Sequence, residues 1–216
     1  MLSVVKSIAL QGLNGIIVNI EVDISSGLPV WEIIGLPDIS VKESKERVRT
    51  ALKNCGIDLL SRKYVINLSP ANIRKTGSVF DLAIAIGILR SIGILKSTID
   101  FQKTLFIGEL SLEGKVEAIS GVLPMCVEAL KAGIKQVIVP HKNIAEASCV
   151  AGLKIIGISS LLETIDYLNG KIHIETEKFC ESDFLRNQTK YSIDFDEVKG
   201  QTAAKRALEI AVARKS

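Results

Sequence analysis

Ser78 is the residue of this chain whose type and setting could most readily support chemistry. It lies in the stretch TGSVFDLAIAIGIL, residues 76–89, where small polar residues lead into a long apolar helix. A serine at such a corner acts as a nucleophile when a histidine or lysine base lies within hydrogen-bond reach. It can also cap the helix, because Ser78 and Asp81 fit the Ser-x-x-Asp capping pattern. The residues alone favour the cap, which needs no base, and leave the nucleophile open.

Other catalytic and ligand-binding patterns are absent from the sequence. It contains no Walker A loop, no GxGxxG after a strand, no HExxH and no GxSxG elbow. The cysteines are far apart and form no CxxC pair: Cys55, Cys126, Cys149 and Cys180. Buried thiols are therefore expected, rather than a disulfide or zinc framework. His141 and His173 are isolated in the sequence, and we expect no metal site.

The elements that must position Ser78 begin with strands. Two alternating segments, residues 3–10 and 15–25, flank the loop QGLNG and predict a hairpin. Residues 29–36 predict a third strand, and residues 40–55 predict a helix that opens with a Ser40–Glu43 capping box. Residues 63–70 predict the strand that leads, through the loop ANIRKTGS, into the helix after Ser78.

The rest of the first 170 residues alternates between strands and helices. Residues 103–119 predict two strands around a Leu-Glu-Gly turn, and the later predicted elements are helices over 121–133, 143–151 and 161–170 with strands over 135–140 and 154–158. Ser160 and Glu163 predict the cap of the last helix. This alternation indicates an α/β (α+β) domain with parallel strand pairs, complete by about residue 170.

The composition changes after residue 170. Residues 171–192 are polar with weak periodicity and predict a linker. A helical pattern with an alanine-rich apolar face returns over residues 200–216, and we expect residues 193–216 to begin a second domain that is truncated here. No apolar run reaches the roughly 18 residues that a membrane span needs, and the alternating N-terminus reads as a strand rather than a signal peptide. We therefore expect a cytoplasmic protein without membrane contact.

Three long motifs, in order, carry a resemblance that covers roughly residues 1–170. They are GLPDISVKESKERVRTAL, NLSPANIRKTGSVFDLAIAIGIL and FIGELSLEGKVEAISGVLPMCVEALKAGIKQVIVP. They resemble the N-terminal domain of the magnesium-chelatase-like AAA+ ATPases of the ComM/YifB family. The segment IDFDEVKGQTAAKRALEIAVA resembles the entry to the AAA+ module of that family, and this implies an edge of a nucleotide pocket at Val198, Gly200 and Gln201.

The same N-terminal pattern is similar to the proteolytic domain of Lon proteases and to the Lon-like domain of RadA/Sms recombination ATPases. That similarity implies the ribosomal protein S5 domain 2-like fold. Aligning the Gly-Pro-Ser-Ala-Gly motif of Lon on Gly77 puts Val79 at the nucleophile position, and counting back from the Ala-Gly-Ile corner puts Leu123 at the lysine position. Neither side chain can attack or take a proton, so the resemblance implies a Lon-like scaffold without the protease. Ser78 is then predicted to be a cap.

The resemblance also implies function by attachment to a motor. ComM-type proteins resemble hexameric, ATP-driven helicases that migrate branched DNA during recombination in natural transformation. Residues 1–170 would then be an oligomerising domain that contacts DNA, in a longer protein that binds ATP and magnesium. The net charge of +3 permits a nucleic-acid partner without arguing for one. The candidate phosphate contacts lie on the predicted helix face and in the loop before Ser78: Lys42, Lys45, Arg49, Arg74 and Lys75.

Two alternatives remain beside this reading. One is a residual peptidase that uses Ser78 with a lysine outside the Lon alignment. The other is a magnesium chelatase subunit, which the Lon-like motifs disfavour because chelatase motor subunits resemble only the AAA+ part of the family. Since the chain has neither a Walker A loop nor the Lon dyad, we expect it to be inactive by itself and to hold no cofactor of its own.

Overall fold

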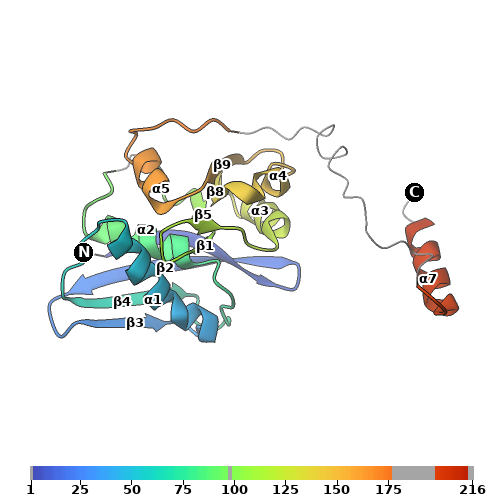
Figure 1. Cartoon of the computed structure of the whole chain (residues 1–216), viewed down its shortest axis with the longest axis horizontal. Coiled ribbons are helices and arrows are strands. Elements are labelled where there is room, and N and C mark those ends of the chain that lie inside the picture. The colour runs from blue at the N-terminus through green and yellow to red at the C-terminus, as the bar shows by residue number, and fades with distance from the viewer. Residues whose placement is uncertain (1, 97–98, 177–197, 214–216) are drawn as a thin grey trace. The chain divides into compact units, whose positions relative to one another are not determined.

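The computed structural model describes residues 2–96, 99–176 and 198–213 (Figure 1). The chain divides into two compact units, residues 1–179 and residues 180–216. Among the described residues, no helix combines the length and the apolar character needed to cross a membrane.

The first unit is built on a seven-stranded mixed sheet (Figure 1). In spatial order its strands are β3 (Val30–Ile34), β4 (Lys63–Ser69), β2 (Asn14–Ser25), β1 (Ser3–Gln11), β5 (Thr104–Phe106), β8 (Gln136–Pro140) and β9 (Lys154–Ile158). The pairs β1–β2 and β2–β4 are antiparallel, whereas the other four neighbouring pairs are parallel. This architecture confirms the predicted α/β fold class and is consistent with the Lon-like fold.

Six described helical segments accompany the strands of this unit. They are α1 (Ile39–Asn54), α2 (Asp81–Ser91), α3 (Val122–Lys131), η1 (His141–Asn143), α4 (Ile144–Ala147) and α5 (Leu161–Leu168). Every α2 residue from Asp81 to Leu89 is buried, because the helix packs on β1 and β2 and is flanked by α1. The approach is close: a Cβ added at Gly87 would lie 2.7 Å from Cγ2 of Val22. The apolar run that the sequence shows after Ser78 is therefore the central helix of the core.

The predicted hairpin is confirmed, and its alternation explains its burial. Val18, Ile20 and Val22 on β2 have no exposed surface, while Asn19 and Glu21 on the other face are partly exposed. Side chains on a strand point alternately to opposite faces, so the period-two pattern puts the first set into the core.

Two local predictions need correction. Helix α1 is capped by Asp38, whose Oδ1 accepts from the Val41 N–H at 2.8 Å, and not by Ser40. Residues 103–119 form three short strands rather than two: β5, then β6 (Glu109–Leu110) and β7 (Val116–Glu117) as a separate ribbon. The break falls at Gly108, whose φ of 155° and crowded surroundings exclude a side chain. The predicted Ser160 cap is confirmed, because its Oγ accepts from the Glu163 N–H.

The second unit contributes one described helix, α7 (Thr202–Ala213), where the sequence predicts one. No residue of this helix is buried. The predicted linker at 171–192 and the residues up to 197 lie mostly outside the described residues. Within the first unit, the chain stays packed past the predicted boundary at 170, since Ile174 still contacts the hydrophobic core.

Candidate functional site

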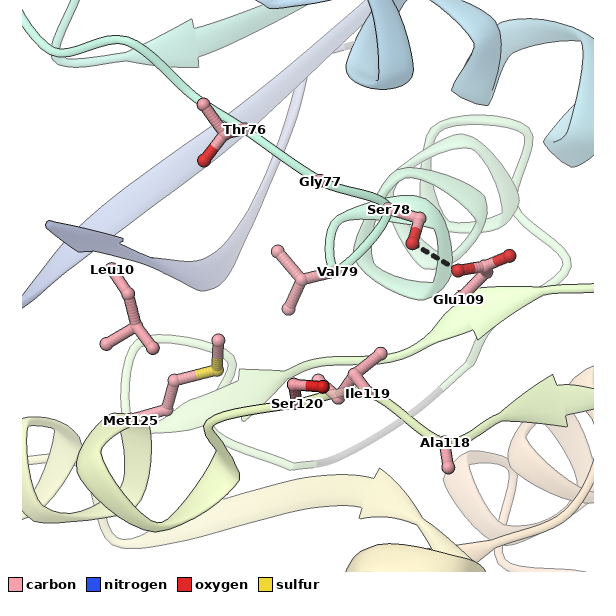
Figure 2. Close-up of a pocket in the computed structure, with 10 residues that line it drawn as sticks. All are labelled: Leu10, Thr76, Gly77, Ser78, Val79, Glu109, Ala118, Ile119, Ser120 and Met125. Carbon is pink, nitrogen blue, oxygen red and sulfur yellow. Dashed lines mark hydrogen bonds between the residues drawn. The ribbon is translucent and has the colours of Figure 1, made fainter. Parts of the chain in front are cut away.

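Ser78 lies on the rim of a pocket of about 370 Å³ (Figure 2). One wall is the loop 76–79 that leads into α2, and the facing wall is the extended segment 118–120 between β7 and α3. Leu10 and Met125 form apolar lining, and Glu109 at the start of β6 adds a carboxylate. Val79, which the alignment puts at the nucleophile position of Lon, lines this pocket.

The hydroxyl of Ser78 donates a hydrogen bond to Oε2 of Glu109, as Figure 2 shows. Helix α2 begins at Asp81 without any side-chain cap, and the Asp81 N–H donates to the backbone carbonyl of Ser78 at 3.2 Å. The prediction that the Ser78 side chain caps this helix is therefore wrong. Asp81 cannot complete a capping box because its own carboxylate is turned into the core.

Asp81 is fully buried and forms a bidentate ion pair with Arg47 of α1. Arg47 Nε donates to Oδ2 at 2.7 Å and Nη2 donates to Oδ1 at 3.1 Å. The Leu110 N–H adds a longer contact of 3.3 Å to Oδ2. The hydrogen bond to Asp81 raises the pKa of Arg47. For Asp81, burial raises the pKa, and the hydrogen bonds from Arg47 and Ser44 oppose that rise.

Sequence analysis gave Arg47 no role and missed this pair. A signal for it exists. Arg47 follows the buried Ser44 by three residues, so it lies on the flank of α1 beside the buried stripe. The pair ties α1 to the start of α2 and to β6, and thereby holds the loop that carries Ser78.

The hydrogen bonding of Ser78 differs from that of a Ser–His or Ser–Lys pair. Among the described residues, the hydrogen bonds of the Ser78 side chain include no lysine or histidine, and its partner is the carboxylate of Glu109. Val79 lines the pocket, while Leu123 lies 38% exposed in the first turn of α3, its N–H bonded to Oε1 of Glu146 at 2.8 Å. Two aliphatic side chains therefore stand where the alignment with Lon puts its nucleophile and base.

The structure contradicts the prediction that Lys75 contacts DNA. Its side chain has no exposed surface, and Nζ donates to the carbonyls of Gly35, at 2.9 Å, and of Pro70. Burial lowers the pKa of Lys75. The ammonium group joins the loop after β3 to the loop after β4, so it is not available to a phosphate.

The other four predicted cations lie at or near the surface. Lys42, Arg49 and Arg74 are exposed, and Lys45 is partly exposed with a 3.9 Å ion pair to Glu46. Lys42, Arg49 and also Lys53 lie on one side of α1, because residues 7 and 11 positions apart are separated by about two and three turns of helix and return to the same face. We call Lys42, Lys45, Arg49 and Lys53 the basic stripe. Glu46 lies on the same outward face next to the stripe, and Glu43 lies farther round the helix and pairs with Arg47 at 3.8 Å.

The structure also brings together residues that the sequence left apart. His141 and His173 line a second pocket of about 380 Å³, together with Glu163. Among the described residues, no cluster of histidine, cysteine and acidic side chains could hold a metal ion. The tertiary fold alone makes this neighbourhood, since the two histidines are far apart in the chain.

The predicted nucleotide edge lies immediately before α7. Val198, Gly200 and Gln201 are exposed, and the Gln201 carbonyl accepts from the Lys205 N–H at 2.9 Å. Gly200 and Gln201 both have positive φ, at 72° and 53°, and form the turn into the helix. Nucleotide contact at these residues stays a prediction.

Comparison with known sequences identifies the family of this chain. The profile of the family described as subunit ChlI of Mg-chelatase matches residues 20–143, more than half of the chain. The chain belongs to the ChlI-type, magnesium-chelatase-like family. Competence protein ComM of Haemophilus influenzae is 36% identical over 214 residues, covering 98% of this chain and 42% of ComM. Protein YifB of Escherichia coli is 34% identical over 212 residues, covering 98% of this chain and 41% of YifB.

A further relative supports the Lon-like character of this ChlI-type chain. Lon protease 2 of Bacillus subtilis is 31% identical over 181 residues, 76% of this chain and 32% of the protease. The chain spans about two fifths of the length of ComM and YifB. The functions of those longer proteins are therefore only proposals for this chain.

Proposed function

We propose that residues 1–170 form a non-proteolytic, Lon-like domain that holds DNA and assembles copies of a longer, ComM-like ATPase. The ATP chemistry would belong to residues beyond this chain, because the sequence contains no Walker A loop. In that longer protein, ATP and magnesium would serve the motor, and a hexameric ring would present one such domain per subunit. The proposed activity of the whole is the remodelling of branched DNA in the cytoplasm.

The observation that carries the proposal is the basic stripe on α1. Lys42, Arg49 and Lys53 project from α1 and form no ion pair in the described part of the chain. From Lys42 to Lys53 the stripe spans about 16 Å at 1.5 Å per residue, which matches about five phosphates of one strand. Arg74 adds a further cation from the loop before α2.

The test is a DNA-binding titration with the whole 216-residue chain. Forked DNA and plain duplex are titrated at several salt concentrations, and molecular mass is measured in parallel by light scattering. Arg49→Glu should weaken binding about tenfold and lower the slope of log K against log salt by about 1. Lys154→Glu is the matched control, because Lys154 is an exposed lysine on β9, at the opposite edge of the sheet from β3.

Two results would contradict the proposal. One is no binding to either DNA at low salt, and the other is binding that Arg49→Glu and Lys154→Glu weaken equally. The peptidase alternative has its own test. A serine-directed covalent reagent should leave Ser78 unlabelled, because its hydroxyl has a carboxylate partner instead of a lysine or histidine base.

A further inference from the structure

Next to the basic stripe, the loop between β3 and α1 exposes two large aliphatic side chains. Leu36 is 55% exposed, and Ile39, the first residue of α1, is 76% exposed. We call Leu36 and Ile39 the apolar tip. Lys42 follows Ile39 by one turn of helix, so the tip continues the stripe at its N-terminal end.

The backbone at Leu36 is unusual. Its φ is +56°, in the left-handed region that glycine and asparagine adopt readily and that is unfavourable for leucine. Such a conformation persists only where surrounding contacts enforce it, and it points to a functional demand on the residue. Here the side chain held in that conformation is apolar, and more than half of its surface is exposed to solvent.

The tip is held rigidly by the neighbouring loop. The Lys75 N–H donates to the Leu36 carbonyl at 3.1 Å, and the Asp38 N–H donates to the Lys75 carbonyl at 3.0 Å. This pairing sets Pro37 opposite Lys75 and brings Leu36 alongside Arg74, whose side chain is also exposed. The buried ammonium of Lys75 fastens the same loop through Gly35. A leucine is thereby fixed beside one arginine and at the head of a row of cations.

Resting on the proposed function, we propose that Leu36 and Ile39 pack against nucleobases exposed at a DNA fork while the basic stripe and Arg74 hold the phosphates. Aliphatic side chains wedge against unstacked bases in several DNA-bending proteins, and cations beside them neutralise the backbone. Charge favours this occupant over a protein surface. Arg74 and Lys42 form no ion pair in the described residues, and the carboxylate of nearby Asp38 is occupied by the N–H groups of Val41 and Gly77.

The experiment separates contact with bases from contact with phosphates. The whole chain is titrated against a fork that carries 2-aminopurine at the first unpaired position and against a duplex of equal length. Leu36→Asn removes the apolar surface and keeps a residue that tolerates the left-handed conformation, so the fold is retained. Leu60→Asn is the matched control, since Leu60 is also 55% exposed and lies in the loop after α1.

Leu36→Asn should lower the affinity for the fork about fivefold, as expected for loss of a half-buried leucine contact. It should also abolish the change in 2-aminopurine fluorescence, leave duplex affinity unchanged and keep the salt slope of the parent. Leu60→Asn should behave like the parent. The inference is overturned if Leu36→Asn binds the fork as the parent does, or weakens fork and duplex alike.

Two further outcomes identify which statement has failed. If Leu36→Asn changes the mass measured by light scattering and not the fluorescence, the tip is a contact between copies of this chain and the inference is wrong. If Arg49→Glu weakens DNA binding while Leu36→Asn does not, the proposed function stands and the tip inference alone falls. If the parent binds no DNA at low salt, both are refuted.

Discussion

Replacing Arg47 with methionine should destabilise the first unit by about 3–5 kcal/mol near neutral pH. The substitution keeps most of the aliphatic stem and removes the guanidinium group. The carboxylate of Asp81, which has no exposed surface, would then keep only Ser44 and the Leu110 N–H as hydrogen-bonding neighbours. A buried charge without its partner costs several times more than a surface ion pair contributes.

The loss of stability in the Arg47→Met variant should depend on pH in a specific way. Burial already raises the pKa of Asp81 in the parent, and loss of Arg47 removes the main opposing influence, so the folded-state pKa rises further. A carboxyl group whose pKa is higher in the folded state contributes its stability fully below the unfolded pKa, near 4, and loses it as the pH rises through the folded pKa. The difference between variant and parent should therefore be small near pH 5 and largest near pH 8.

The assay is urea unfolding at these pH values, followed by fluorescence. Trp31 is the single tryptophan in the sequence and stacks on Tyr64 with ring centroids 4.6 Å apart, so it reports on the sheet edge that α1 covers. Arg49→Met is the control, because Arg49 is exposed on the same helix and should change stability by less than about 0.5 kcal/mol. A loss below about 1 kcal/mol at pH 8, or an equal loss at both pH values, would show that Arg47 does not compensate a buried carboxylate.

Three further predictions concern other buried features. Lys75→Met should cost about 1–3 kcal/mol in urea unfolding, because the partly buried carbonyls of Gly35 and Pro70 lose their donor, while the salt slope of DNA binding stays that of the parent. Gly35→Ala should destabilise by at least about 2 kcal/mol, or fail to accumulate folded protein, since its φ is 99° and the new Cβ would lie 2.2 Å from the Leu68 carbonyl oxygen; a stable variant would contradict this packing. Burial raises the pKa of Cys126 to about 12, so peptide mapping after iodoacetamide treatment at pH 8 should find Cys149 alkylated and Cys126 intact.

Much of the fold follows from local pattern. The period of two in β1 and β2 and the unbroken apolar run of α2 predict elements that the structure contains at almost the same residues. These signals are reliable because the apolar residues on the buried face of a strand or helix recur at fixed spacings along the sequence. The prediction of two strands in 103–119 is wrong because strands of two residues carry too little pattern to be separated.

Predictions about the contacts of single polar side chains were less reliable than predictions of strands and helices. Ser160 caps its helix as its spacing predicts, whereas Ser78, with an equivalent spacing, does not. The difference lies in Asp81, because Arg47, 34 residues earlier in the chain, holds its carboxylate in the core. A capping pattern describes a local preference, and a buried ion pair overrides it.

The sequence by itself determined the elements, their order and the family, since each depends on residues that are neighbours along the chain. It also showed that a valine and a leucine occupy the positions where Lon carries its dyad, because side-chain identity is enough to exclude a nucleophile and a base. Only the tertiary structure decided which cations reach solvent. Lys75 and Arg74 are adjacent in the sequence, yet the pairing of two loops turns the first into the core and leaves the second beside Leu36 at the surface.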